Sequence, residues 1–321
     1  MKIIVIPGLT LPDVGAADLA RIRRAAGAES TVLLCDLEMA MEEVADADVI
    51  FGPAPPALFA KAQRLRWVQA IASGVDGYLY PDFVDSDVLL TSEKGLVGEH
   101  LADHAFGLLL MLTRQLATAH RLGPDSWAHR VEMRRQEVEL TGMTMGIFGL
   151  GGTGRATARR AAAFGMRCIA VDRDQVPPAR EVEDVLPLDR IEEFLGAADV
   201  IAVCCPLTGE TRSFFDAATF ARMRRGAWLV NVTRGEVLVE ADLVAALKSG
   251  QLAGAALDVA PREPLPPESE LWSLPNVVMT PHTAGASQFR AGRNLDRFVR
   301  NVERFAGGKP LEGLIDKRAG Y

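Results

Sequence analysis

Three side chains with complementary chemistry follow apolar stretches in the second half of the sequence. Arg234 follows "LVNVT", Glu263 follows "AGAALDVAPR", and His282 follows "NVVMTP". Each apolar stretch is typical of a strand in a parallel sheet, and open parallel sheets bind ligands beyond the carboxyl ends of their strands. We therefore expect the three side chains to meet at one edge of a sheet.

An arginine, a glutamate and a histidine at one place suit the reduction of a 2-oxo acid. The guanidinium of Arg234 can hold the carboxylate through a bidentate pair and polarise the ketone. The imidazolium of His282 can give its proton to the developing alkoxide, while Glu263 keeps that imidazole charged and oriented. Taken singly, Arg234 is more typical of a surface or capping residue, and Glu263 of a solvated loop charge.

A glycine-rich turn provides a place for the hydride donor that such a reduction needs. Gly149-x-Gly151-x-x-Gly154 lies between an apolar strand and an Ala-rich helix, and a second strand ends at Asp172, about 20 residues further on. In this context the glycines indicate a dinucleotide-binding turn, where a helix N-terminus meets the pyrophosphate. Asp172 favours NAD by accepting hydrogen bonds from the ribose. Arg173 beside it can hold a 2′-phosphate, so NADP remains the less favoured alternative.

The elements that must position these residues alternate along the chain. Apolar runs and helical stretches alternate from "KIIVI" to "DVLLTS" in the first hundred residues, and again from "TMGIFGLGGTG" to "NVVMTPH". This rhythm predicts an α/β fold with two domains, each built on a parallel sheet. Long helices are predicted over residues 100–120 and 293–308, the second ending at two glycines. The residues alone leave open whether the C-terminal stretch returns to the first domain.

Composition excludes several other function classes. The 321-residue chain has a formal net charge of −7 and no basic run, which argues against a nucleic-acid or anionic-membrane surface. No uncharged stretch reaches the ~18 apolar residues of a membrane helix, and the first apolar run is too short for a signal peptide. We therefore expect a cytoplasmic protein.

Neither the cysteines nor the histidines indicate a metal site. The four cysteines lie in apolar segments without C-x-x-C spacing, which is typical of buried thiols. His100 and His104 are an i, i+4 pair, but "HLADH" lacks the glutamate of H-E-x-x-H, and no third ligand is evident. We predict no metal, and a packing or hydrogen-bonding role for both histidines.

At this level of detail the chain resembles the D-isomer-specific 2-hydroxyacid dehydrogenases. The likeness covers nearly the whole chain and is densest from about 140 to 287. It rests on the order and spacing of "GIFGLGGTG", "CCPLTGET", "LVNVTRGEVLVEADLVAALKSGQLAGAALDV", "REPLP" and "NVVMTPHTAG". The resemblance implies a Rossmann-type doubly wound parallel sheet for the dinucleotide at 99–287. It also implies a flavodoxin-like α/β substrate domain formed by 1–98 and 288–321.

The resemblance also implies roles for individual residues. Arg234, Glu263 and His282 would be catalytic. Ser73 and Gly74 in "ASGVD", whose backbone N–H groups would bind the substrate carboxylate, would contact the substrate together with Arg234 and His282. Asp258 would face the nicotinamide carboxamide. The glycine turn and the resemblance together predict these cofactor contacts: Gly149, Gly151, Gly152, Thr153, Gly154, Asp172, Arg173, Cys205, Val232, Thr233, Asp258 and Gly285.

Three positions depart from the pattern of the family. Ser92 stands where many members have asparagine, Asp103 where glutamate is usual, and Thr153 where isoleucine is usual. These departures leave the reaction type intact but weaken any inference about the substrate. Because members of the family dimerise through the coenzyme domain, the resemblance implies a homodimer.

The expected function is an NAD(H)-dependent reductase of a small 2-oxo acid such as glyoxylate or hydroxypyruvate. One alternative is a formate or phosphite dehydrogenase, although formate enzymes carry glutamine where this chain has Glu263. Another alternative is a non-catalytic NAD(H)-sensing interaction protein, because the fold also serves transcriptional corepressors.

Overall fold

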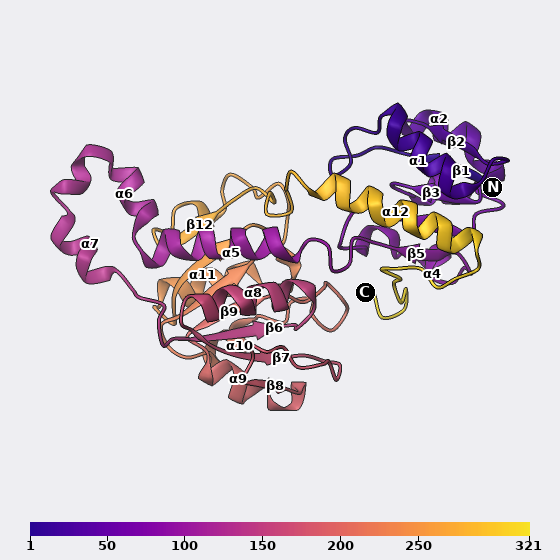
Figure 1. The fold of residues 1–321 in the computed structure, drawn as a ribbon. Helices are drawn as coiled ribbons and strands as arrows, with labels where there is room; N and C mark the ends of the chain where they lie inside the picture. Colours follow the sequence, from indigo (N-terminus) through magenta and orange to yellow (C-terminus); the bar gives the residue numbers. More distant parts are fainter. The chain divides into compact units, whose positions relative to one another are not determined.

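The computed structural model describes all 321 residues and contains two compact units. One unit comprises residues 1–97 and 286–321, and the other comprises residues 98–285. In Figure 1 the first unit carries both the indigo start and the yellow end of the chain. Each unit is built on its own parallel sheet, so the predicted α/β class is confirmed.

The first unit has a five-stranded parallel sheet in the order β2-β1-β3-β4-β5, which is the flavodoxin-like order. Its strands are β1 (Lys2–Val5), β2 (Thr31–Leu34), β3 (Val49–Phe51), β4 (Trp67–Gln69) and β5 (Leu89–Thr91). Its helices are α1 (Ala16–Ala26), α2 (Leu37–Glu43), α3 (Pro56–Phe59), α4 (Pro81–Val84) and α12 (Arg290–Ala306). A separate apolar cluster covers each face of the sheet, as a doubly wound fold requires.

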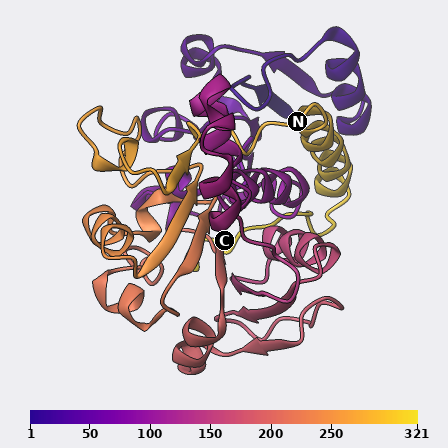
Figure 2. The same ribbon diagram turned by 90° about the vertical axis from the view of Figure 1, so that its left-hand side faces the viewer.

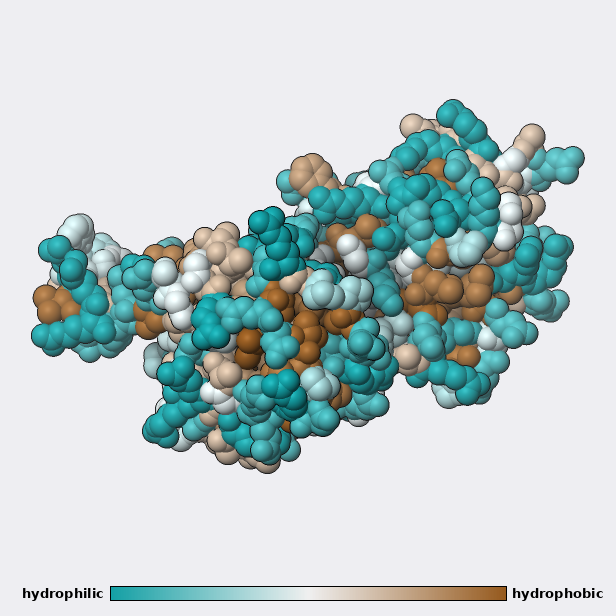
Figure 3. Space-filling view, turned by 60° about the horizontal axis from the view of Figure 1, so that its bottom comes forward, coloured by the Kyte–Doolittle hydropathy of each residue, from teal (hydrophilic) through white to brown (hydrophobic).

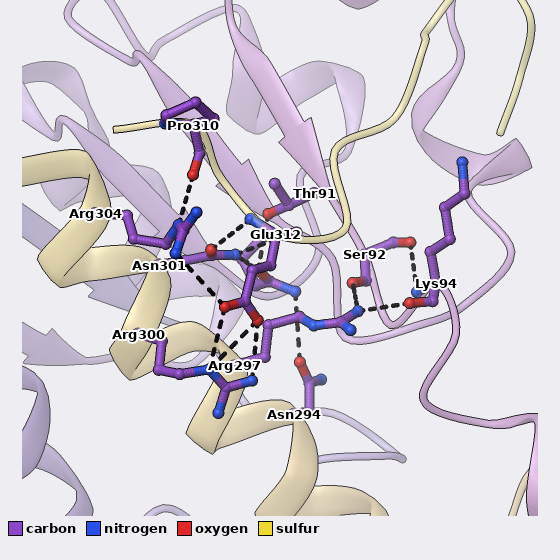
Figure 4. A network of polar contacts seen from close by, with 11 residues as sticks. Thr91, Ser92, Lys94, Asn294, Arg297, Arg300, Asn301, Arg304, Pro310 and Glu312 are labelled. Carbon is purple, nitrogen blue, oxygen red and sulfur yellow. Dashed lines mark hydrogen bonds and ion pairs between the residues drawn. The ribbon is translucent and has the colours of Figure 1, made fainter. Parts of the chain in front are cut away.

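The C-terminal helix α12 belongs to this first unit through both apolar and polar contacts. Phe298 stacks on Phe51 of β3 with ring centroids 4.0 Å apart. On the polar side, the buried Asn301 donates to Gln69 of β4 and to the carbonyl of Glu312. Arg297 donates to the carbonyls of Ser92 and Lys94 just beyond β5, as Figure 4 shows. Burial and hydrogen bonding together fix this helix against the sheet.

The second unit has a seven-stranded parallel sheet in the order β12-β11-β10-β9-β6-β7-β8, a Rossmann order extended by one strand. Its strands are β6 (Thr144–Phe148), β7 (Arg167–Val171), β8 (Asp184–Leu186), β9 (Val200–Val203), β10 (Ala227–Asn231), β11 (Leu252–Leu257) and β12 (Val277–Met279). Helices α5 (Gly98–Thr113) and α8 (Gly152–Ala163) bury one face. Helices α9 (Ile191–Ala197), α10 (Ala217–Arg222) and α11 (Glu240–Lys248) bury the other.

The single helix predicted over residues 100–120 is wrong, because the chain breaks it after Thr113. Gln115 adopts a left-handed φ of 53°, and a separate helix α6 (Leu116–Leu122) follows. Together with the 3₁₀ turn Gly123–Trp127 and helix α7 (Arg130–Gln136), α6 forms an arm that projects from the second unit in Figure 1. The short strand β8 was also not predicted.

The arm, residues 116–136, exposes large apolar side chains. Trp127 is 79% exposed, Val131 65% and Leu116 52%. The arm faces the viewer in Figure 2, and Figure 3 shows hydrophobic surface on it. None of the helices combines the length and the apolar composition that a membrane-spanning helix needs.

Candidate active site

His282 and Glu263 form a direct pair beyond the ends of neighbouring strands β12 and β11. The imidazole Nδ1 lies 2.7 Å from Oε2 of Glu263. The other carboxylate oxygen, Oε1, accepts the backbone N–H of Ala260 at 3.0 Å, which fixes the glutamate on its own loop. Because Nδ1 faces the glutamate, Nε2 is the ring nitrogen left to meet a substrate. Both side chains are partly exposed, so a ligand can reach the pair.

The backbone at His282 is strained. Its φ is 53°, a left-handed conformation that costs a residue with a Cβ on the order of 1 kcal/mol. The amide of His282 donates to the carbonyl of Asp258 at 2.7 Å, which helps to hold this conformation. Strained residues of this kind cluster at functional sites, where the surrounding structure holds them in place.

Arg234 lies three residues beyond β10, the strand adjacent to β11. The fully buried Asn231 organises its loop. The side chain of Asn231 accepts the N–H and the hydroxyl of Thr233 at 3.0 and 3.1 Å and donates to the carbonyl of Arg234 at 2.9 Å. The guanidinium Nη1 in turn donates to the carbonyl of Thr233. Sequence reasoning missed Asn231, whose only signal is an amide at the end of an otherwise apolar strand.

Gly235 joins the loop of Arg234 to the loop of Glu263. A Cβ added at Gly235 would lie 1.9 Å from the carbonyl carbon of Ala260, whose N–H is held by Glu263. Only glycine permits the two backbones to approach so closely. The three side chains named from the sequence therefore extend from the loops that follow three adjacent strands, β10, β11 and β12. The backbones of the first two loops approach each other at Gly235 and Ala260.

We expect Gly235→Ala to lower the free energy of unfolding by about 3 kcal/mol, because the methyl group would overlap backbone atoms that cannot move aside. Calorimetric melting would measure the change. Gly196→Ala in helix α9 is the matched control, since no atom lies within 4 Å of its added Cβ. Equal melting temperatures for both variants and the parent protein would contradict this interpretation of Gly235.

The glycine turn has the shape that a dinucleotide requires. Gly149 has a φ of 99°, and an added Cβ there would meet Cys205 Cα at 2.9 Å. A Cβ on Gly154 would lie 2.2 Å from the carbonyl oxygen of Gly149, whereas one on Gly151 would meet nothing within 4 Å. The turn is thus tightly packed at Gly149 and Gly154, and space is left beside Gly151. Helix α8 begins at Gly152 and presents its first backbone N–H groups there.

Asp172 follows β7 directly and lies against this turn. Its Oδ2 accepts the N–H of Leu150 at 2.7 Å, and its Oδ1 accepts the N–H of Asp174 at 3.0 Å. The neighbouring guanidinium of Arg173 pairs with Glu210, at 3.3 Å. The carboxylate of Asp172 is therefore fixed next to the glycine turn, while the guanidinium of Arg173 pairs with Glu210.

The remaining predicted contacts divide between the two units. Thr153 lies in the first turn of α8, Val232 and Thr233 follow β10, and Gly285 is the last residue of the second unit. Ser73 and Gly74 belong to the first unit, where they lie, partly exposed, in the loop after β4.

Asp258 lies buried beneath the loop that carries His282. Its side chain is completely buried and accepts hydrogen bonds from the hydroxyl of Thr280 at 2.6 Å and from the N–H groups of Thr283 and Ala284 at 2.9 and 2.8 Å. Its carboxylate therefore shapes the loop that carries His282.

The cysteines and the paired histidines of α5 form no metal centre. No group of three or more His, Cys, Asp or Glu side chains is placed to hold a metal ion, and all four cysteines are free thiols. Burial raises the pKa of the Cys168 thiol to about 11, and burial likewise raises that of Cys205. A thiol with a raised pKa is a poor nucleophile at neutral pH. His104 Nε2 lies 2.8 Å from the hydroxyl of Thr280, in the loop of His282.

Comparisons with known proteins find similar sequences and structures in one enzyme family. A family model described as D-isomer specific 2-hydroxyacid dehydrogenase, NAD binding domain, matches residues 106–284. The chain is 35% identical over 288 residues to a glyoxylate reductase of Korarchaeum cryptofilum, covering 86% of this chain and 85% of that protein. It is 31% identical over 328 residues to a hydroxypyruvate reductase of Blautia hydrogenotrophica, covering 97% and 98%.

A solved structure is similar over the whole length. The NADPH-dependent glyoxylate/hydroxypyruvate reductase of Sinorhizobium meliloti, in complex with NADP and sulfate, superposes with a TM-score of 0.81 at 29% identity, with all of both chains covered.

Proposed function

Because the chain belongs to the D-isomer specific 2-hydroxyacid dehydrogenase family, we propose that it is an NAD(H)-dependent reductase of a small 2-oxo acid, glyoxylate or hydroxypyruvate. The observation that carries the proposal is the 2.7 Å pair of His282 and Glu263 beside the loop of Arg234. This arrangement would supply a proton donor, His282, and a carboxylate-binding cation, Arg234, at one sheet edge. The names of the relatives support the choice of substrate class.

Each residue has a defined part in the proposed reaction. Arg234 binds the carboxylate of the 2-oxo acid and polarises its ketone. His282 donates a proton from Nε2 to the ketone oxygen as it becomes an alkoxide, and Glu263 stabilises the imidazolium through Nδ1. The backbone of Ser73 and Gly74 is proposed to bind the substrate carboxylate as well. A bound nicotinamide cofactor supplies the hydride.

The cofactor would be held by the glycine turn and the residues around it. Gly149, Gly151, Gly152, Thr153 and Gly154 would receive the pyrophosphate at the start of α8, and Gly285 would leave room for the nicotinamide. Cys205, Val232 and Thr233 are proposed to line the same site. The open space at Gly151 and the free first turn of α8 support this fit.

NAD is proposed over NADP on the chemistry of Asp172 and Arg173. Asp172 would repel a 2′-phosphate, and the pairing of Arg173 with Glu210 competes for the guanidinium. We expect kcat/KM with NADH to exceed that with NADPH by about tenfold or more, a difference of about 1.4 kcal/mol. Asp172→Ser should lower the ratio of kcat/KM with NADH to kcat/KM with NADPH. Initial rates with both cofactors would measure this ratio. A parent protein that prefers NADPH would contradict the assignment.

The function itself is tested by turnover of a panel of 2-oxo acids with NADH. We expect oxidation of NADH with glyoxylate or hydroxypyruvate, followed at the absorbance of the cofactor. NADH binding without turnover of any acid would favour an NAD(H)-sensing interaction protein instead. Reduction of NAD by formate or phosphite would favour a formate or phosphite dehydrogenase.

A homodimer is the proposed assembly, and the arm at 116–136 supports it. Exposed apolar patches of sufficient size mark protein–protein interaction sites. We expect two chains per particle in sedimentation at micromolar concentration. Replacing Trp127 by Ser and Val131 by Lys together should weaken association at least about tenfold. Leu9→Ser is the control, because Leu9 is 95% exposed in the other unit. A monomeric parent protein would refute the assembly.

A further inference from the structure

A chain of hydrogen bonds connects helix α5 to the loop that carries His282. His104 Nε2 lies 2.8 Å from the hydroxyl of Thr280 and 3.4 Å from Asp258 Oδ1, and the Thr280 hydroxyl donates to Asp258 Oδ1 at 2.6 Å. Asp258 then accepts the N–H groups of Thr283 and Ala284. All of these residues belong to the second unit. These hydrogen bonds therefore hold the loop at Thr280, before His282, and at Thr283 and Ala284, after it.

The count of protons fixes the direction of this chain. Thr280 has one hydroxyl proton, and it is given to Asp258, so the oxygen of Thr280 must accept from His104. His104 is therefore the tautomer with a proton on Nε2, or the imidazolium. The carboxylate of Asp258 is wholly buried and depends on these donors, because a buried charge without partners is costly.

The same chain holds His282 in its strained conformation. The amide of His282 donates to the carbonyl of Asp258, and the side chain of Asp258 binds the next two amides. Without the donor from His104, Thr280 can turn its hydroxyl away from Asp258. The loop then loses the hydrogen bond between Thr280 and Asp258.

We propose that His104 is a positioning residue that acts through Thr280 and Asp258 to hold the His282 loop in its left-handed conformation. The proposal rests on the proposed function for its catalytic consequence, but the anchoring of the loop is independent of any substrate. In these hydrogen bonds His104 reaches Thr280 and Asp258 but not the His282 ring. It therefore affects the position of the proton donor and not the proton transfer itself.

Hydrogen exchange of the ligand-free protein tests the anchoring directly. In His104→Phe and Thr280→Val we expect the amides of residues 282–284 to exchange about tenfold faster, with other core segments unchanged. Thr280→Ser and His104→Gln keep the hydrogen-bonding groups and should exchange as the parent does. Thr113→Val is the matched control, because its hydroxyl bonds only within α5, to the carbonyl of Leu109.

Kinetics test the consequence for the proton donor. His104→Phe and Thr280→Val should lower kcat roughly tenfold while KM for NADH stays within about twofold, because the loop moves but the glycine turn does not. Unchanged exchange at residues 282–284 in both variants would overturn the proposal. So would exchange that quickens throughout the unit, or faster loop exchange with unchanged kcat. A parent protein that reduces no 2-oxo acid would refute the proposed function, while the exchange measurement would still decide the anchoring.

Discussion

Replacing His282 by glutamine is expected to lower kcat for reduction of a 2-oxo acid by roughly 10³-fold. Glutamine keeps a polar side chain of similar reach, but its amide is too weak an acid to transfer a proton to the alkoxide. The affinity for NADH, measured by fluorescence titration, should change little, because the glycine turn lies elsewhere in the unit. His120→Gln on the exposed arm is the control and should retain full activity.

The pairing of Glu263 with His282 is expected to contribute to the rate as well. Glu263→Gln keeps a hydrogen-bond acceptor near Nδ1 but removes the charge that stabilises the imidazolium, so we expect kcat to fall by about 10- to 100-fold. The double variant should be no slower than His282→Gln alone, because residues that act as a unit are not additive. Fully multiplicative losses would contradict a direct partnership of the two side chains.

Replacing Arg234 by lysine is expected to cost roughly 10²-fold in kcat/KM for the 2-oxo acid. Lysine keeps the positive charge but cannot form two parallel hydrogen bonds to a carboxylate, whereas the guanidinium of Arg234 has donors for this pair besides the one given to the carbonyl of Thr233. Steady-state kinetics would show both a higher KM for the acid and a lower kcat.

The control for Arg234→Lys is the same change at Arg262, which is exposed on the loop of Glu263. We expect Arg262→Lys to leave the kinetics within about twofold, as for most surface changes. If the two variants lost activity equally, general positive charge rather than bidentate binding would explain the effect of Arg234.

The two sheets could be predicted from the sequence because periodicity and glycine spacing are local signals. Apolar runs marked most strands, and Gly149 to Gly154 marked the start of α8. The break at Gln115 could not be predicted, since glutamine has no special preference for a left-handed φ and the helical pattern continues on both sides of it. Strand β8 has only three residues and one buried side chain, too few for a pattern.

The chemical residues of the site were also visible in the sequence, but the residues that position them were not. Arg234, Glu263 and His282 each follow a strand, so their common edge could be inferred. Asn231 acts through side-chain hydrogen bonds to loop backbone, and Thr280 acts through its hydrogen bond to the carboxylate of Asp258. Both kinds of bond depend on the three-dimensional course of the loops. His104 lies 176 residues from its partner Thr280, a separation that no local pattern reports.

The central claim is that a hydride passes from the nicotinamide to C2 of a 2-oxo acid while His282 supplies the proton. The most direct measurement uses NADH carrying deuterium at both positions of the nicotinamide C4, with hydroxypyruvate as the acceptor. The account predicts D-glycerate with one deuterium at C2, formed by the parent protein and lost with His282→Gln. Absence of glycerate, an L-product, or glycerate without deuterium would contradict it.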